Sequence, residues 1–132
     1  MEVGEMEIKN YRDLRVWQSG MDLVVMVYEL SDKFPAKEMY GLTSQIRRAA
    51  VSVTANIAEG AGRSGGGDFS RFLYIAMGSA CELECESALA RDLRLLPSDQ
   101  YEPLAARISE VKRMLGALVD RVESARTVNR KP

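Results

Sequence analysis

The sequence predicts an all-α protein, folded as a single antiparallel, up-and-down four-helix bundle. Apolar residues recur at alternating steps of three and four in four segments, which is the period of an amphipathic helix. Strand patterns are absent. Only a few residues separate successive segments, so each helix has to run antiparallel to the one before it, because a short connection cannot cross back over a bundle. A chain of 132 residues is the size of one domain.

The predicted helices cover about residues 11–33, 40–60, 68–94 and 98–125. The first should end before Phe34-Pro35, because proline disfavours helical geometry in the residue before it, and the second should end at Gly60. The tails, residues 1–9 and 127–132, lack the period and are expected to be loosely ordered. The stripes expected to face the core are Leu14, Trp17, Met21, Val24 and Tyr28; Leu42, Ile46, Ala50, Val53 and Ile57; Leu73, Ala76, Ala80, Leu83, Ser87 and Ala90; and Leu104, Ile108, Val111, Leu115, Leu118 and Val122.

The charges are nearly balanced, with 18 basic and 19 acidic residues and a formal net charge of −1. No global field therefore attracts the protein to polyanions, and nucleic acid would need a local patch, for which Arg47 and Arg63 are the candidates. The first ten residues carry three acids and one lysine, the reverse of the basic start of a secretory or transit peptide. The tightest apolar run, Val24 to Tyr28, is far too short to span a bilayer. We expect a cytoplasmic protein with no membrane contact.

The sequence offers little for catalysis. It contains no histidine, the usual general base near neutral pH. Cys81 and Cys85 supply at most half of a zinc site, so we interpret them as reduced and buried small side chains. Glu82, Glu84 and Glu86 could bind magnesium weakly, although solvated or ion-paired acids are the simpler interpretation. We expect no enzyme activity, no metal, no cofactor and no small-molecule substrate.

The segment from Gly60 to Gly65, GAGRSG, formally matches the G-x-G-x-x-G dinucleotide fingerprint. That fingerprint works only where a strand delivers the chain to the turn, and here a predicted helix precedes it. We therefore interpret the segment as a helix-to-helix corner. Some affinity for anions remains, because Arg63 and the amide groups at the start of the third helix both attract phosphate.

Polar residues form a second line along the second helix. Gln45, Arg48, Ser52, Asn56 and Glu59 share one face, next to the apolar stripe. In an antiparallel pair the numbers of facing residues have a nearly constant sum, and a sum of 130 would bring Arg48 level with Glu82 and Glu59 level with Arg71. We interpret this polar seam, which comprises Gln45, Arg48, Ser52, Asn56, Glu59, Arg71 and Glu82, as paired groups that fix helix alignment.

The second and third helices are more apolar than one buried face requires. Further apolar or small residues lie beside each core stripe, and small residues on the third helix permit close approach of another helix. Contiguous apolar surface on a monomer marks an interface, so we expect self-association. The alternative is that the first and fourth helices cover these residues. The predicted oligomer interface is formed by Val51, Thr54, Ala58, Phe72, Ile75 and Ser79, with Leu89 and Leu93 extending it.

Residues 41–60, GLTSQIRRAAVSVTANIAEG, closely resemble the signature of the small bacterial four-helix-bundle proteins named after intervening sequences in 23S ribosomal RNA genes. LRVWQ (14–18), Phe34-Pro35 with Glu38, and FSRFLYIAMGSACELE (69–84) support the resemblance, which covers about residues 11–122. Thr54 stands where the family pattern usually has proline. The resemblance implies an antiparallel bundle that assembles into a ring, typically a pentamer, without established enzymatic activity. The chain also resembles the accessory protein of diversity-generating retroelements, which binds a reverse transcriptase and nucleic acid.

These observations favour a non-enzymatic, ring-forming homo-oligomeric scaffold or adaptor that contacts structured RNA, or a nucleic-acid enzyme, through Arg47 and Arg63. A protein-only interaction module, in which those arginines serve intersubunit pairing, is the alternative. A magnesium-dependent enzyme using Glu82 and Glu86 is the third hypothesis, and it lacks partner ligands.

Overall fold

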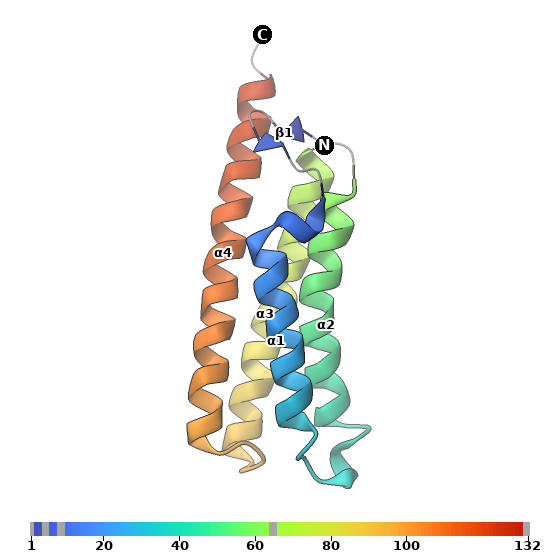
Figure 1. Ribbon diagram of the computed structural model, residues 1–132, viewed down its shortest axis with the longest axis vertical. Helices are drawn as coiled ribbons and strands as arrows, with labels where there is room; N and C mark the ends of the chain where they lie inside the picture. Colours follow the sequence, from blue (N-terminus) through green and yellow to red (C-terminus); the bar gives the residue numbers. More distant parts are fainter. Residues whose placement is uncertain (1, 4–5, 8–9, 64–65, 131–132) are drawn as a thin grey trace.

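The computed structural model describes residues 2–3, 6–7, 10–63 and 66–130, with side chains described for residues 10–63 and 67–127. Four helices lie side by side and alternate in direction (Figure 1). They are α1 (Arg15–Ser31), α2 (Leu42–Ala61), α3 (Gly66–Asp92) and α4 (Ser98–Arg130). Each helix contacts both of its neighbours in the bundle. The predicted all-α four-helix bundle is therefore confirmed.

Three of the four predicted core stripes are buried throughout. Every residue expected to face the core from α2, α3 and α4 is buried, and Leu73, Leu83, Ile108 and Leu115 are among the largest side chains that are fully buried. Burying each of these side chains stabilises the fold by roughly 1.5–3 kcal/mol. The periodicity of the sequence thus identified these three faces correctly.

The stripe predicted for α1 is wrong by one position around the helix. The buried residues are Val16, Gly20, Leu23, Val27 and Ser31. Gly20 explains the rotation, because a Cβ atom built on it would lie only 2.7 Å from Thr54 Cγ2 of α2. The two helices therefore approach each other at a residue without a side chain. A prediction that follows apolar residues alone selects the flank of this contact, where Met21 and Tyr28 are exposed.

The connections between the helices are short, and they include a 3-10 turn and a residue with a left-handed backbone conformation. A 3-10 turn, η2 (Ala36–Glu38), joins α1 to α2, and another, η1 (Tyr11–Asp13), precedes α1. Between α3 and α4, Arg94 has a φ of 62°, and the Leu95 and Leu96 amides donate to the Ala90 carbonyl. This is the left-handed ending common at helix C-termini, here without the glycine that usually occupies it.

Two features differ from the sequence prediction. Strands β1 (Glu2–Val3) and β2 (Met6–Glu7) form a two-residue antiparallel pair, and β1 contacts α4. A pair this short is below the length at which alternation can be detected. Helix α4 extends to Arg130, beyond its predicted end near 125. The remaining tail positions (1, 4–5, 8–9 and 131–132), and Ser64 and Gly65 of the glycine segment, lie outside the described residues.

Candidate interaction surface

The polar seam connects α2 and α3 through two hydroxyl groups. Ser52 Oγ and Ser79 Oγ lie 2.8 Å apart. Asn56 Nδ2 donates to the Ser52 carbonyl at 2.8 Å and to Ser52 Oγ at 3.0 Å. The facing pair Ser52 and Ser79 sums to 131, one more than the predicted register. Among the described side chains, a single hydrogen bond between neutral groups, Ser52 to Ser79, therefore joins the two helices along the seam, and Asn56 supports Ser52 from within α2.

The ion pairs expected along this seam are not formed within the described residues. Glu59 pairs with Arg63, one turn away on its own helix, and not with Arg71. Arg71 pairs with Asp68 at 3.5 Å. Arg48 Nη2 donates to Ser44 Oγ at 3.2 Å and leaves Glu82 unpaired. Partners within one turn of the same helix are favoured over partners on another helix, because they require less ordering of long side chains.

Two carboxyl groups of α3 lie further along the same side. Glu86 is buried, and its Oε1 atom has no hydrogen-bond partner within the described residues. Burial raises the pKa of Glu86 to about 7, and the nearby Glu82 contributes both charge repulsion and a hydrogen bond. Glu84 lies elsewhere and pairs with Lys112 of α4 at 3.1 Å. In the described part of the chain, no three His, Cys, Asp or Glu side chains gather where they could hold a metal.

An apolar face lies beside the polar seam on the outside of α2 and α3. Val51 and Ile75 are each 41% exposed, and Leu89 and Leu93 are 46% and 54% exposed. Ala58, Phe72 and Ser79 are half-buried, and Val51 also lines a groove beside α1 that is described below. We call this set, comprising Val51, Ala58, Phe72, Ile75, Ser79, Leu89 and Leu93, the α2–α3 face. Four of its apolar side chains, Val51, Ile75, Leu89 and Leu93, are exposed in a single chain.

One predicted interface residue does not belong to this face. Thr54 is buried, packs against Gly20 of α1 and donates through Oγ1 to the Val51 carbonyl at 3.0 Å. It therefore contributes to the core and not to the surface. Cys81 and Cys85 are free thiols, but their predicted burial is wrong, because both are exposed. Both lie on the solvent-exposed side of α3, away from its buried stripe.

A groove of about 640 Å³ opens where α1, η2 and α2 meet. Arg47 lines it with its guanidinium 4.6 Å from the ring centre of Tyr28, and its Nε donates to Ser31 Oγ at 2.8 Å. Asp32 lies 3.9 Å from Arg47 Nη2. Tyr40, also on the groove, is 98% exposed. Arg47 is thus held in place with one face on an aromatic ring, an arrangement that its sequence neighbours did not reveal.

Arg63, the other predicted nucleic-acid contact, lies at the opposite end of α2. Besides pairing with Glu59, its guanidinium lies 5.2 Å from the ring centre of Phe72, and that of Arg71 lies 4.5 Å from the same centre. The structure therefore separates Arg47 and Arg63 by four turns of α2 and places them on no common site.

A comparison with known protein families shows which family this chain belongs to. The model of the 23S rRNA-intervening sequence protein family matches residues 12–117. The chain belongs to this family. A crystal structure of a protein of unknown function from the S23 ribosomal protein family of Bacteroides thetaiotaomicron VPI-5482 has the same fold, with a TM-score of 0.75 and 24% identity over 80% of this chain and 95% of that one. No curated protein matches the chain.

The part matched to the 23S rRNA-intervening sequence protein family contains the polar seam, the α2–α3 face and the Arg47 groove. The last turns of α4, which carry Glu123 and Arg126, lie beyond the matched residues. No helix among the described residues has the length and apolar character needed to cross a membrane.

Proposed function

We propose that this protein is a non-enzymatic, cytoplasmic adaptor that assembles into a homo-oligomeric ring through its α2–α3 face. The observation that supports this most directly is the row of exposed aliphatic side chains, Val51, Ile75, Leu89 and Leu93, on two adjacent helices. Apolar patches of this kind on soluble proteins mark interaction sites. The family resemblance implies a ring of five subunits.

A second copy of the same chain is the partner that fits this face best. Gly78 leaves open space, since a Cβ atom on it would meet nothing within 4 Å, so a neighbouring helix can approach closely. Arg48 and Glu82 are both exposed on this side and form no ion pair with each other. A face that carries an unpaired cation and an unpaired anion is complementary to another copy of itself.

Light scattering of two variants tests this proposal. Ile75→Lys places a charge on the α2–α3 face and should reduce the mass towards that of a monomer. Ala117→Lys places the same charge on the exposed side of α4 and should leave the assembly unchanged. Equal masses for both variants and the unmodified protein would reject this face as the interface, provided that circular dichroism shows unchanged helicity.

A second function, contact with structured RNA, is favoured by the Arg47 groove. The exposed ring of Tyr40 offers a stacking surface, and Arg47 and Arg48 line the same groove. Aromatic stacking combined with guanidinium groups is the usual chemistry of unpaired bases and their phosphates. RNA affinity should then fall steeply with salt, and Arg47→Gln should lower the slope by about one. Binding no stronger than that of an unrelated acidic protein would leave the protein-only module.

A further inference from the structure

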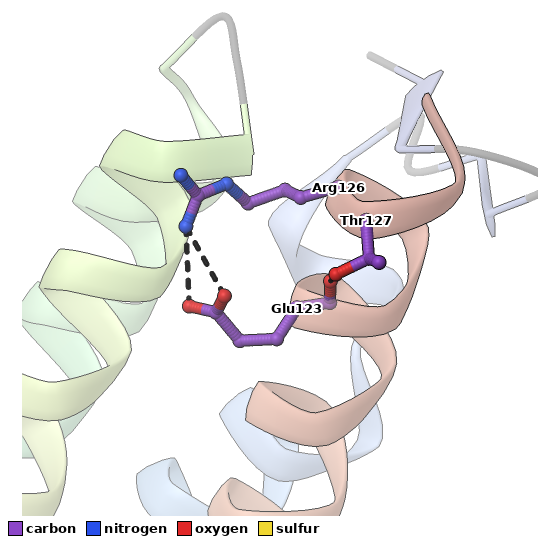
Figure 2. Close-up of polar contacts among 3 residues, drawn as sticks. All are labelled: Glu123, Arg126 and Thr127. Carbon is purple, nitrogen blue, oxygen red and sulfur yellow. Dashed lines mark hydrogen bonds and ion pairs between the residues drawn. The ribbon is translucent and has the colours of Figure 1, made fainter. Parts of the chain in front are cut away.

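A second groove, of about 510 Å³, lies between the first turns of α3 and the last turns of α4. It is lined by Gly67, Ser70 and Arg71 of α3 and by Glu123 and Arg126 of α4, among others. Figure 2 shows Glu123 and Arg126 extending from α4 towards α3. This groove is remote from the Arg47 groove, and it borders the α2–α3 face, because Ile75 lines it as well.

Arg126 lies in an electrostatically unusual position. Its Nη2 atom would be 3.5 Å from a Cβ atom on Gly67, so the guanidinium rests against the first turn of α3. A helix N-terminus carries a partial positive charge and its first N–H groups have no acceptor within the helix, so it favours anions and not cations. Arg126 is nevertheless held there, because its Nη1 atom donates to both carboxylate oxygens of Glu123 at 3.2 Å (Figure 2).

The bond to Glu123 uses only part of the guanidinium. Arg126 Nη2 and Nε make no hydrogen bond within the described residues and lie on the side of Gly67. Arg71 lines the same groove with a side chain that is 57% exposed. Its guanidinium lies 3.5 Å from Asp68 and 4.5 Å from the ring centre of Phe72. Two guanidinium groups on different helices therefore keep free donors at one helix N-terminus.

Ser70 provides a third, independent indication. It lines the groove, is only 3% exposed, and its Oγ atom has no hydrogen-bond partner within the described residues. A buried hydroxyl group without a partner costs roughly 1–3 kcal/mol. Helical serines commonly avoid this cost by bonding to the carbonyl one turn earlier, as Ser87 does with Leu83 at 2.7 Å. Ser70 does not, so its hydroxyl is left without a partner at the wall of the groove.

We propose that this groove binds a phosphate group. Arg126, Arg71 and the Ser70 hydroxyl would donate to its oxygens together with the amides of the first turn of α3, while Glu123 holds Arg126 in position. Donors that converge from several directions suit a tetrahedral anion with three or four oxygens better than a planar carboxylate with two. Asp68 and Glu123 balance the local charge, so recognition depends on directed donors and not on a long-range field. Free phosphate and the phosphodiester backbone of RNA share this chemistry.

Calorimetric titration with inorganic phosphate at constant ionic strength tests the site. Arg126→Gln should weaken phosphate binding about tenfold or more, because it removes a charged bidentate donor. Gly67→Ala should weaken it as well, since the methyl group enters the groove at ordinary contact distance from Arg126 and is compatible with the helix. Arg113→Gln, at an exposed position of α4 without an ion pair in the described residues, is the matched control and should bind like the unmodified protein.

A fluorescent single-stranded RNA oligonucleotide distinguishes the two sources of phosphate. If RNA is the ligand, inorganic phosphate should displace it and Arg126→Gln should weaken it, whereas Arg113→Gln should not. If only free phosphate binds, the titration shows the differences and the RNA signal is the same for all variants. The proposal is overturned if neither ligand binds the unmodified protein, or if Arg126→Gln and Gly67→Ala bind both ligands as the control does.

Discussion

Replacing Glu86 by glutamine should make the protein more stable at neutral and alkaline pH. Glu86 is buried on α3 beside Glu82, and its pKa is raised from 4.5 to about 7. The unfolded chain therefore loses this proton near pH 4.5, whereas the folded protein keeps it until about pH 7. Because the folded state binds more protons in this window, stability falls as pH rises from about 4.5 to 7 and stays low above it.

The size of the effect follows from the same displacement of the pKa. It corresponds to about 3.5 kcal/mol at most, since one pKa unit is about 1.4 kcal/mol. Glu86 lies at the edge of the bundle, next to exposed Glu82, and screening by solvent reduces the figure to about 1–2 kcal/mol. Glutamine has nearly the same shape and no charge, so Glu86→Gln should gain this amount at pH 8, or roughly 3–8 °C in Tm.

Urea unfolding of the two proteins at several pH values between 4 and 8.5 measures the difference directly. The gain should grow from near zero at pH 4.5 to its full value above pH 7. Glu110→Gln, at an exposed position of α4, serves as the control and should show no such trend. A Glu86→Gln variant that is no more stable than the unmodified protein at pH 8, or a gain independent of pH, would refute the reasoning.

Two further predictions concern the backbone. Gly60→Ala should destabilise the protein by about 1–3 kcal/mol in urea unfolding, because the new Cβ atom would lie 2.7 Å from Phe72 Cβ and force α2 and α3 apart. An unchanged unfolding midpoint would contradict this close approach. Arg94→Gly should stabilise the protein by about 1 kcal/mol in the same assay, because the φ of 62° strains every residue except glycine; a loss of stability would show that the Arg94 side chain matters more than its backbone.

Periodicity predicted the bundle because three of its helices bury continuous apolar stripes. Ile46, Leu83 and Ile108 lie in stripes where every third or fourth residue is apolar or small. In α1 the contact is made at Gly20, a residue that an apolar pattern does not count. Thr54 was misplaced for the same reason, because its partner in the core is that glycine.

The candidate sites could be predicted less completely. The helical period placed Ile75 outside the core stripe of α3 and correctly indicated an exposed side chain. Ion-pair partners could not be predicted, because several acids compete for each arginine and small differences in reach decide between them, as for Glu59 and Arg63. The groove at Arg126 depends on the contact between two helix ends far apart in sequence, which no local pattern records.

The central claim is that copies of this chain associate through the outside of α2 and α3. Sedimentation equilibrium of the unmodified protein over a range of micromolar concentrations tests it most directly. We expect a particle whose mass is several times that of the 14.7 kDa chain. A mass of one chain at every concentration would contradict it.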